Sequence, residues 1–237
     1  LLLVSCKEDT EIVNGGWFKS AKDIALDASN RLKFTPTING PLSLIAAVPF
    51  GTMQQMDGVQ AISVSFSKPM VAIGASADNL PAGQLQVTPS VSGKLRWEGT
   101  QTLVFQPDTP LSNATEYKVV LRKGLKALNG ESLNEDFEWI FETPRPSVVY
   151  SEPADGTEQV SNKPTIFVRF NQGMAAGTAS GYVSLRMKDG GTVGARVEKK
   201  GDSTLVTRPT ETLSHGPPHQ VVWAKRLRGK EGGLGME

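Results

Sequence analysis

Apolar and polar residues alternate in several short runs along the chain. In residues 62–66, Ile, Val and Phe alternate with two serines, and residues 166–170 carry the same three apolar residues at the same spacing. Alternation with a period of two residues is typical of a half-buried β-strand. Similar runs occupy residues 84–88, 93–97, 102–106, 117–121 and 137–143. Turn-forming residues separate these runs, so the pattern predicts an all-β protein built from short strands.

The chain also repeats itself on a larger scale. Residues 43–70 align without a gap with residues 147–174, at a spacing of 104 residues. The positions that are identical are Ser43/Ser147, Pro49/Pro153, Gln55/Gln159, Ile62/Ile166, Val64/Val168, Phe66/Phe170 and Met70/Met174. Such a period is too long for a solenoid repeat and fits whole tandem domains. The repeat and the strand spacing together predict two tandem immunoglobulin-like β-sandwiches, over residues 41–144 and 145–237.

The second predicted sandwich lacks its last strand. Residues 220–223 match residues 118–121, and residues 227–232 stand where residues 125–130 stand in the first repeat. No later segment matches Phe137–Thr143. An uncovered apolar edge invites pairing or aggregation, so we expect the second sandwich, truncated in this way, to be less stable than the first.

The N-terminal segment differs from both repeats. Residues 7–40 are predicted to form a tether, and within it Ser20–Leu32 has weak helical spacing that indicates a short helix or a loop.

The chain has a single cysteine, Cys6, which follows Leu3, Val4 and Ser5 and precedes the polar run 7–11. This arrangement resembles a bacterial lipobox, in which the cysteine is lipidated and becomes the mature N-terminus. Residues 1–6 are therefore interpreted as the remnant of a signal peptide with its lipobox, and the chain as a fragment. Its acyl chains would hold the protein on a membrane without spanning it. The alternatives are an artefact of the start site and a buried cysteine near the N-terminus.

The composition and net charge of the chain limit the classes of partner that it is expected to bind. Hydrophobic residues make up 38% of the chain and charged residues 21%, as in soluble globular proteins. A formal net charge of +1 argues against nucleic acid as an obligate partner, because phosphate binding needs a concentrated basic face. The densest basic run, residues 225–230, is interpreted as a solvated strand edge rather than a functional patch.

Two sequence features could suggest metal binding, and neither fits. His215 and His219 have the spacing of a helical zinc site, but Pro217 and Pro218 forbid a helix, so both are predicted as loop histidines. The carboxylate-rich run 131–136 is interrupted by a leucine and lacks the spacing of a calcium loop. No nucleophile motif such as Gly-x-Ser-x-Gly is present. The sequence predicts no catalytic, metal or cofactor site, and hence no enzyme.

Several motifs resemble known families. Residues 64–70 (VSFSKPM) resemble the strand and turn of bacterial Ig-like modules of the S-layer SbsA type. Residues 93–97, 102–107, 111–121 and 137–146 resemble the N-terminal region of bacterial alpha-2-macroglobulins. The most particular feature is the Phe-x-Thr-Pro-Arg-Pro junction at residues 141–146. The resemblance covers about residues 41–233.

The resemblance implies a large lipoprotein of the bacterial cell envelope. In the alpha-2-macroglobulin family, strings of β-sandwich domains precede a bait region and often a Cys-x-Glu-Gln thioester, and cleavage of the bait captures the protease. The partners implied are a membrane, downstream macroglobulin-like domains and captured proteases. The chain is predicted to be the non-catalytic, lipid-anchored stem of such an inhibitor. Lys7, directly after the anchor cysteine, favours the outer membrane. The alternatives are a surface stalk or adhesin module and the accessory β-domain of a secreted hydrolase.

Overall fold

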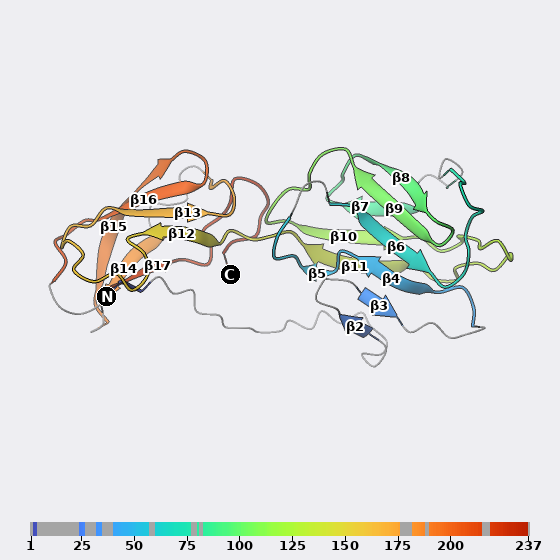
Figure 1. The fold of residues 1–237 in the computed structure, drawn as a ribbon, viewed down its shortest axis with the longest axis horizontal. Coiled ribbons are helices and arrows are strands. Elements are labelled where there is room, and N and C mark those ends of the chain that lie inside the picture. Colours follow the sequence, from blue (N-terminus) through green and yellow to red (C-terminus); the bar gives the residue numbers. More distant parts are fainter. Residues whose placement is uncertain are drawn as a thin grey trace. The chain divides into compact units, whose positions relative to one another are not determined.

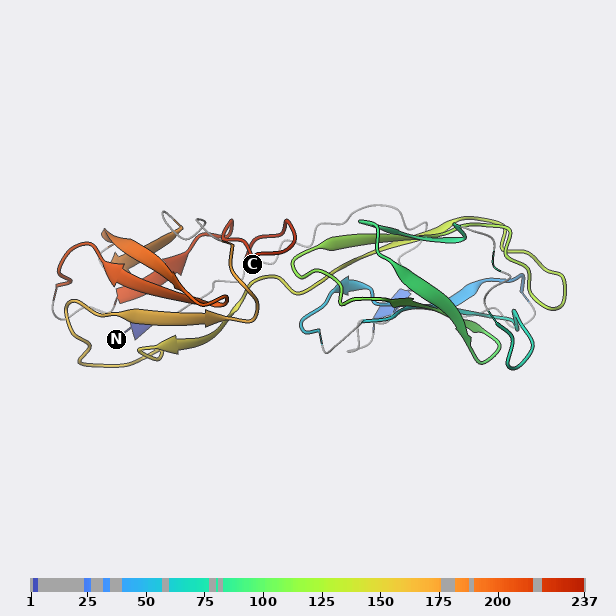
Figure 2. The same ribbon diagram turned by 90° about the horizontal axis from the view of Figure 1, so that it is seen from above.

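The computed structural model describes residues 2–3, 24–26, 32–34, 40–56, 60–76, 80, 83–175, 182–187, 190–214 and 219–236. Every regular element in these ranges is a β-strand, which confirms the predicted all-β fold (Figures 1 and 2). The chain divides into two compact units. The N-terminal unit comprises Asn14–Ser112 and Glu116–Pro144, and the C-terminal unit comprises Leu1–Val13, Asn113–Thr115 and Arg145–Glu237.

Two sheets form the N-terminal unit. The larger sheet is antiparallel, in the order β2 (Ile24–Leu26), β3 (Leu32–Phe34), β4 (Leu44–Val48), β6 (Ile62–Phe66), β9 (Thr102–Pro107) and β8 (Gly93–Glu98). The smaller sheet has the order β5 (Gly51–Thr52), β11 (Phe137–Glu142), β10 (Glu116–Leu121) and β7 (Leu85–Thr88). Strand β10 is antiparallel to both of its neighbours, whereas β5 lies parallel to β11.

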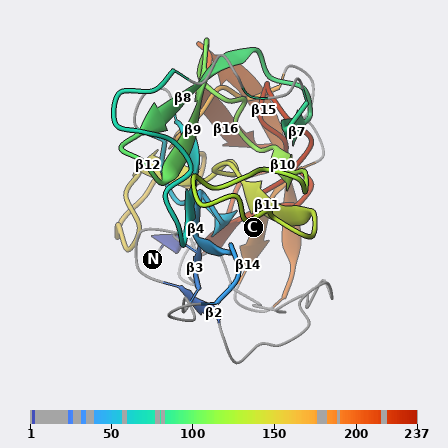
Figure 3. The same cartoon turned by 90° about the vertical axis from the view of Figure 1, so that its right-hand side faces the viewer.

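Strands β2 and β3 correct the prediction for the N-terminal segment. Ile24–Leu26 pairs antiparallel with Leu32–Phe34, and β3 then pairs with β4. Figure 3 shows β2, β3 and β4 in succession at one side of this unit. The expected helix or loop over Ser20–Leu32 is therefore wrong for residues 24–26, and the sheet begins inside the segment that was expected to be a tether.

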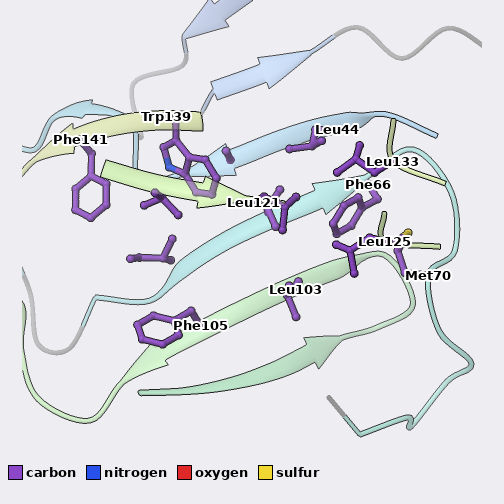
Figure 4. Packing of buried hydrophobic residues seen from close by; sticks show 14 of the residues in the cluster. Leu44, Phe66, Met70, Leu103, Phe105, Leu121, Leu125, Leu133, Trp139 and Phe141 are labelled. Atoms are coloured by element: carbon purple, nitrogen blue, oxygen red, sulfur yellow. The ribbon is translucent and has the colours of Figure 1, made fainter. Parts of the chain in front are cut away.

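The core of the N-terminal unit lies between the two sheets (Figure 4). Ile62, Val64 and Phe66 are fully buried on one face of β6, while the serines between them are half-buried. The facing sheet contributes Trp139 and Phe141 from β11. Each such side chain stabilises the fold by about 1.5–3 kcal/mol through burial alone. This packing of inward faces is that of a β-sandwich, as the alternation predicts.

The C-terminal unit contains seven strands in one continuous order. They are β1 (Leu2–Leu3), β17 (His219–Trp223), β14 (Val183–Met187), β15 (Thr192–Lys200), β16 (Thr204–Pro209), β13 (Ile166–Phe170) and β12 (Val148–Glu152). Strand β15 is long enough to pair with β14 near its start and with β16 over its second half. It therefore carries the sheet from one side of the core to the other. The core again includes fully buried Ile166 and Val168.

Backbone hydrogen bonds confirm that the two units share one plan. Ser67 N–H donates to the Ser43 carbonyl at 2.8 Å, and the matching Asn171 N–H donates to the Ser147 carbonyl at 3.0 Å. A second pair of bonds matches in the same way. The Leu128 N–H donates to the Pro69 carbonyl at 2.9 Å in the N-terminal unit, and the Lys230 N–H donates to the Gly173 carbonyl at 2.7 Å in the C-terminal unit. The repeat in the sequence is thus a repeat of the same fold.

Candidate functional site

Of the residues with predicted roles, Cys6, Lys7 and His215 lie outside the described residues. His219 is described, and the structure corrects its prediction as a loop residue. It is the first residue of β17, pairs with Met187 of β14 and is 9% exposed. Its Nε2 atom has no hydrogen-bond partner. Because backbone pairing holds this histidine inside the sheet, its buried imidazole is part of the core.

Two carboxylates of the run 131–136 make contacts within the N-terminal unit. The Glu131 carboxylate accepts hydrogen bonds from the Lys68 ammonium group and from the Leu42 backbone N–H. The Lys68 hydrogen bond is the main reason that the pKa of Glu131 lies below its usual value. Both partners lie far away in sequence, so Glu131 joins the loop before β11 to the segment before β4 through Leu42 and to the turn after β6 through Lys68.

Asp136, at the other end of the same run, accepts hydrogen bonds from two groups that Glu131 does not contact. Its Oδ1 accepts a hydrogen bond from the Lys123 backbone N–H at 2.8 Å, and its Oδ2 one from Arg122 at 2.7 Å. These contacts, the Lys123 N–H first, lower the pKa of Asp136. The two carboxylates thus serve separate contacts. Across the described part of the chain, no group of three or more His, Cys, Asp or Glu residues could hold a metal ion.

The basic run 225–230, which was expected to be a solvated strand edge, begins as a turn at residues 225–226, and Arg228 and Gly229 then form isolated antiparallel bridges with Gly235 and Met174. Leu227 in its middle is fully buried, and the Arg226 guanidinium lies over the Tyr182 ring, 4.9 Å from its centroid. Lys230 forms an ion pair with Asp202, with 3.6 Å between Nζ and Oδ2. The run is therefore anchored within the C-terminal unit by one apolar and two charged side chains. Among the described residues, no helix is long and apolar enough to cross a membrane.

The outer edge of β17, meaning the edge that faces away from β14, is the least complete part of the C-terminal unit. Among the described residues, β17 pairs on this edge only with β1, in parallel and only at His219 and Gln220. The indole Nε1 of Trp223, at the other end of β17, is buried without a hydrogen-bond partner. In the N-terminal unit the matching strand β10 pairs with β11 along all six of its residues. Residues 221–223 of β17 have no strand partner on this edge among the described residues.

Both units match one protein family. A family model described as bacterial Ig-like domain matches residues 38–143 and again residues 142–232. The chain belongs to the bacterial Ig-like domain family. Domains of this family are generally non-catalytic and are typical of bacterial surface or envelope proteins. The two bacterial Ig-like domains meet at the Phe-x-Thr-Pro-Arg-Pro junction.

The solved structures that match this chain are remote from it in sequence and in structure. A fragment of native alpha-2-macroglobulin from Escherichia coli, spanning domains MG0-NIE-MG1, is 16% identical with a TM-score of 0.35. The match covers 78% of this chain and 61% of that one. L,D-transpeptidase 3 from Mycobacterium tuberculosis is 14% identical, with a TM-score of 0.28, and the match covers 66% of this chain and 58% of the transpeptidase. A second L,D-transpeptidase, from Mycobacterium tuberculosis H37Rv, is 14% identical, with coverages of 76% and 89% and a TM-score of 0.28. A comparison with curated protein sequences found no match.

Proposed function

We propose that this chain is a non-catalytic scaffold of a bacterial envelope protein, in which two bacterial Ig-like domains act as a spacer. The tandem family match carries this proposal, because it accounts for both units with one kind of domain. The contacts of Glu131 and Asp136 support it, since they tie loops of the N-terminal unit together.

We further propose that the scaffold is the N-terminal stem of an alpha-2-macroglobulin-like protease inhibitor. The support is the sequence resemblance of residues 137–146, whose junction is built into the fold. The Thr143 hydroxyl at this junction is buried and donates a hydrogen bond to the Ser112 carbonyl at 2.7 Å. Pro144 and Pro146 are buried as well. A surface stalk or adhesin would use the same two domains, so the two functions must be separated by experiment.

The test uses the natural full-length protein, incubated with a broad-specificity protease. A protease enclosed by the inhibitor keeps its activity on a small peptide substrate, which can still reach its active site. It loses activity on a large protein substrate, because the enclosing inhibitor keeps that substrate out. We expect this split for the inhibitor. If adding the protein changes protease activity on neither substrate, the inhibitor function is refuted and the surface stalk remains as the proposed function.

The lipid anchor at Cys6 is a separate part of the proposal. The natural protein, expressed in a bacterium fed with a labelled fatty acid, should carry the label and lose it in the Cys6→Ala variant. Lys7→Ala is the matched control, because it changes the neighbouring residue and keeps the thiol. Label retained by the Cys6→Ala variant would refute the anchor.

A further inference from the structure

We propose that the outward face of four strands of the C-terminal unit binds an acidic polysaccharide, through Arg169 and Lys200. The strands are β12, β13, β16 and β15, which lie side by side in this order (Figure 1). The inference rests on the side chains of this face and on a comparison of the two units. It does not depend on the proposed function.

One row of side chains crosses this face from strand to strand. Backbone pairing places Arg169 between Tyr150 on one side and Thr204 on the other, and Lys200 pairs with Thr204 in turn. The residues on either side of Arg169 in β13 are buried, so the row points away from the core. Neighbouring strands lie about 4.8 Å apart, which puts the Cα atoms of Arg169 and Lys200 about 10 Å from each other. The row therefore presents two cations with a small hydroxyl side chain between them.

Two aromatic rings position the two cations. The Arg169 guanidinium lies over the Tyr150 ring, 5.5 Å from its centroid, and the Lys200 ammonium nitrogen lies 5.2 Å from the centroid of Phe167. Neither cation forms an ion pair with a residue that the structure describes. A cation that already rests on a ring loses less side-chain freedom when an anion binds to it. The face thus offers two positioned charges that remain available to a ligand.

The N-terminal unit shows that the fold does not require these cations. Its strands pair in the same register, which places Ser65 at the position of Arg169 and Glu98 at the position of Lys200. The hydroxyls of Ser65 and Thr102 share a hydrogen bond of 2.9 Å, and Glu98 is held in an ion pair. The outward face of the N-terminal unit is thus satisfied by its own side chains. The C-terminal unit instead carries two charges that the common fold leaves unused.

The chemistry of the face defines the class of ligand. Two cations in a row complement an extended molecule with repeated anionic groups, and arginine binds a carboxylate through two parallel hydrogen bonds. In the next row, the Glu152 carboxylate accepts a hydrogen bond from the Tyr150 hydroxyl at 3.3 Å and has further lone pairs for hydroxyl donors. A sugar chain with carboxylate groups supplies both the anions and the hydroxyls. Val206, at the centre of the face, is 4% exposed, so the face lacks an apolar centre that could insert into a lipid surface.

The experiment measures, by isothermal titration calorimetry, the affinity of residues 1–237 for polygalacturonate, a polymer of a carboxylated sugar. The matched ligand is the same polymer with its carboxylates methyl-esterified, which keeps the sugar chain and removes the charge. The test variant combines Arg169→Ser with Lys200→Glu, which introduces the residues that the N-terminal unit carries at these positions. The control variant combines Arg186→Ser with Lys94→Glu, which makes the same two changes at exposed positions of β14 and β8 and gives the same net charge.

We expect the test variant to bind polygalacturonate about tenfold or more weakly than the unchanged chain, and the control variant to differ by less than about twofold. The esterified polymer should bind more weakly than the acid, and added salt should weaken binding of the acid. Equal losses in the two variants would overturn the proposal, because they would show an effect of net charge alone. So would the absence of measurable binding to polygalacturonate, or equal binding of the esterified polymer.

Two further probes separate the polysaccharide from other anionic partners. Polyglutamate represents an acidic polypeptide, and vesicles of phosphatidylglycerol represent an anionic lipid surface. We expect both to bind more weakly than polygalacturonate. Tighter binding of either probe, lost in the variant that combines Arg169→Ser with Lys200→Glu, would overturn the polysaccharide and assign the face to that other partner.

Discussion

The indole Nε1 of Trp139 donates a hydrogen bond to the carbonyl oxygen of Pro49 at 3.0 Å. Trp139 lies in the closing strand β11, and Pro49 directly follows β4 in the opposite sheet. The bond thus joins the two layers of the N-terminal unit across ninety residues of sequence. Pro153 occupies the position of Pro49 in the C-terminal unit, where the described residues include no strand that could supply the matching indole.

The first prediction concerns this bond. Trp139→Phe should lower the free energy of unfolding of the N-terminal unit by about 2 kcal/mol, because it leaves the Pro49 carbonyl without its donor and removes buried volume. The matched control is Trp223→Phe, which removes an indole N–H that has no partner. Urea titrations, monitored by NMR resonances from each unit separately, would measure the free energy of unfolding for both variants. A cost for Trp223→Phe in its own unit as large as that for Trp139→Phe would contradict this account.

A second prediction follows from the lowered pKa of Glu131. Its carboxylate is held mainly by the Lys68 hydrogen bond, so the folded state binds the proton less tightly than the unfolded state. The resulting stability is complete above the usual pKa of 4.5 and is lost as the pH falls below it, through the lowered value. Glu131→Gln should therefore destabilise the N-terminal unit at pH 7, and this difference should shrink in acid.

Urea unfolding at a series of pH values from 7 to about 3 would test the Glu131 prediction. The exposed residue Glu135 lies in the same loop, and Glu135→Gln provides the control. A destabilisation by Glu131→Gln that stays constant with pH would show that the carboxylate charge is not its cause.

The third prediction concerns Gly93 in β8. A Cβ atom at this position would lie 2.5 Å from both the Gln106 carbonyl oxygen and Cζ of Phe105. The backbone oxygen cannot move aside without breaking the β8–β9 pairing, so Gly93→Ala should destabilise the N-terminal unit by about 2 kcal/mol. Gly233→Ala adds a Cβ that meets nothing within 4 Å and should be nearly neutral. Thermal unfolding of both variants measures the difference, and equal shifts would refute the steric argument.

The fourth prediction tests the junction residue Thr143. Its hydroxyl is buried and donates to the Ser112 carbonyl, so Thr143→Val should destabilise the N-terminal unit by about 1–2 kcal/mol. Thr143→Ser keeps the hydroxyl and should retain more of the stability than the valine variant does. Denaturant unfolding of the two variants would decide, and a serine variant no better than valine would mean that the methyl group matters more than the hydrogen bond.

The inward side of each sandwich could be predicted because its signal is local. Ile62, Val64 and Phe66 alternate with polar residues within five positions, and the same triplet recurs 104 residues later. Strands β2 and β3 could not be predicted in this way, because three residues are too few to show a period. They are fixed instead by pairing with β4, a tertiary contact that the local sequence does not encode.

For the outer edge of β17, the sequence predicts only that a matching strand is absent. The missing match to Phe137–Thr143 indicates that a strand is lacking, but it does not show which groups lose their partners. His219 was predicted as a loop residue because the proline pair before it dominates the local pattern. Its burial follows from pairing with β14, whose Met187 lies 32 residues earlier in the sequence.

The outward faces of β6 and β13 differ as clearly as their inward faces agree. Between the repeated Ile, Val and Phe, strand β6 carries Ser63 and Ser65, whereas β13 carries Phe167 and Arg169. The Phe167 ring lies 5.2 Å from the Lys200 ammonium nitrogen, so this face presents an aromatic ring capped by a cation. The two strands therefore present the same side chains to their cores and different side chains to their surroundings. A molecule that contacts these outward faces would meet serines on β6 but an aromatic ring and an arginine on β13.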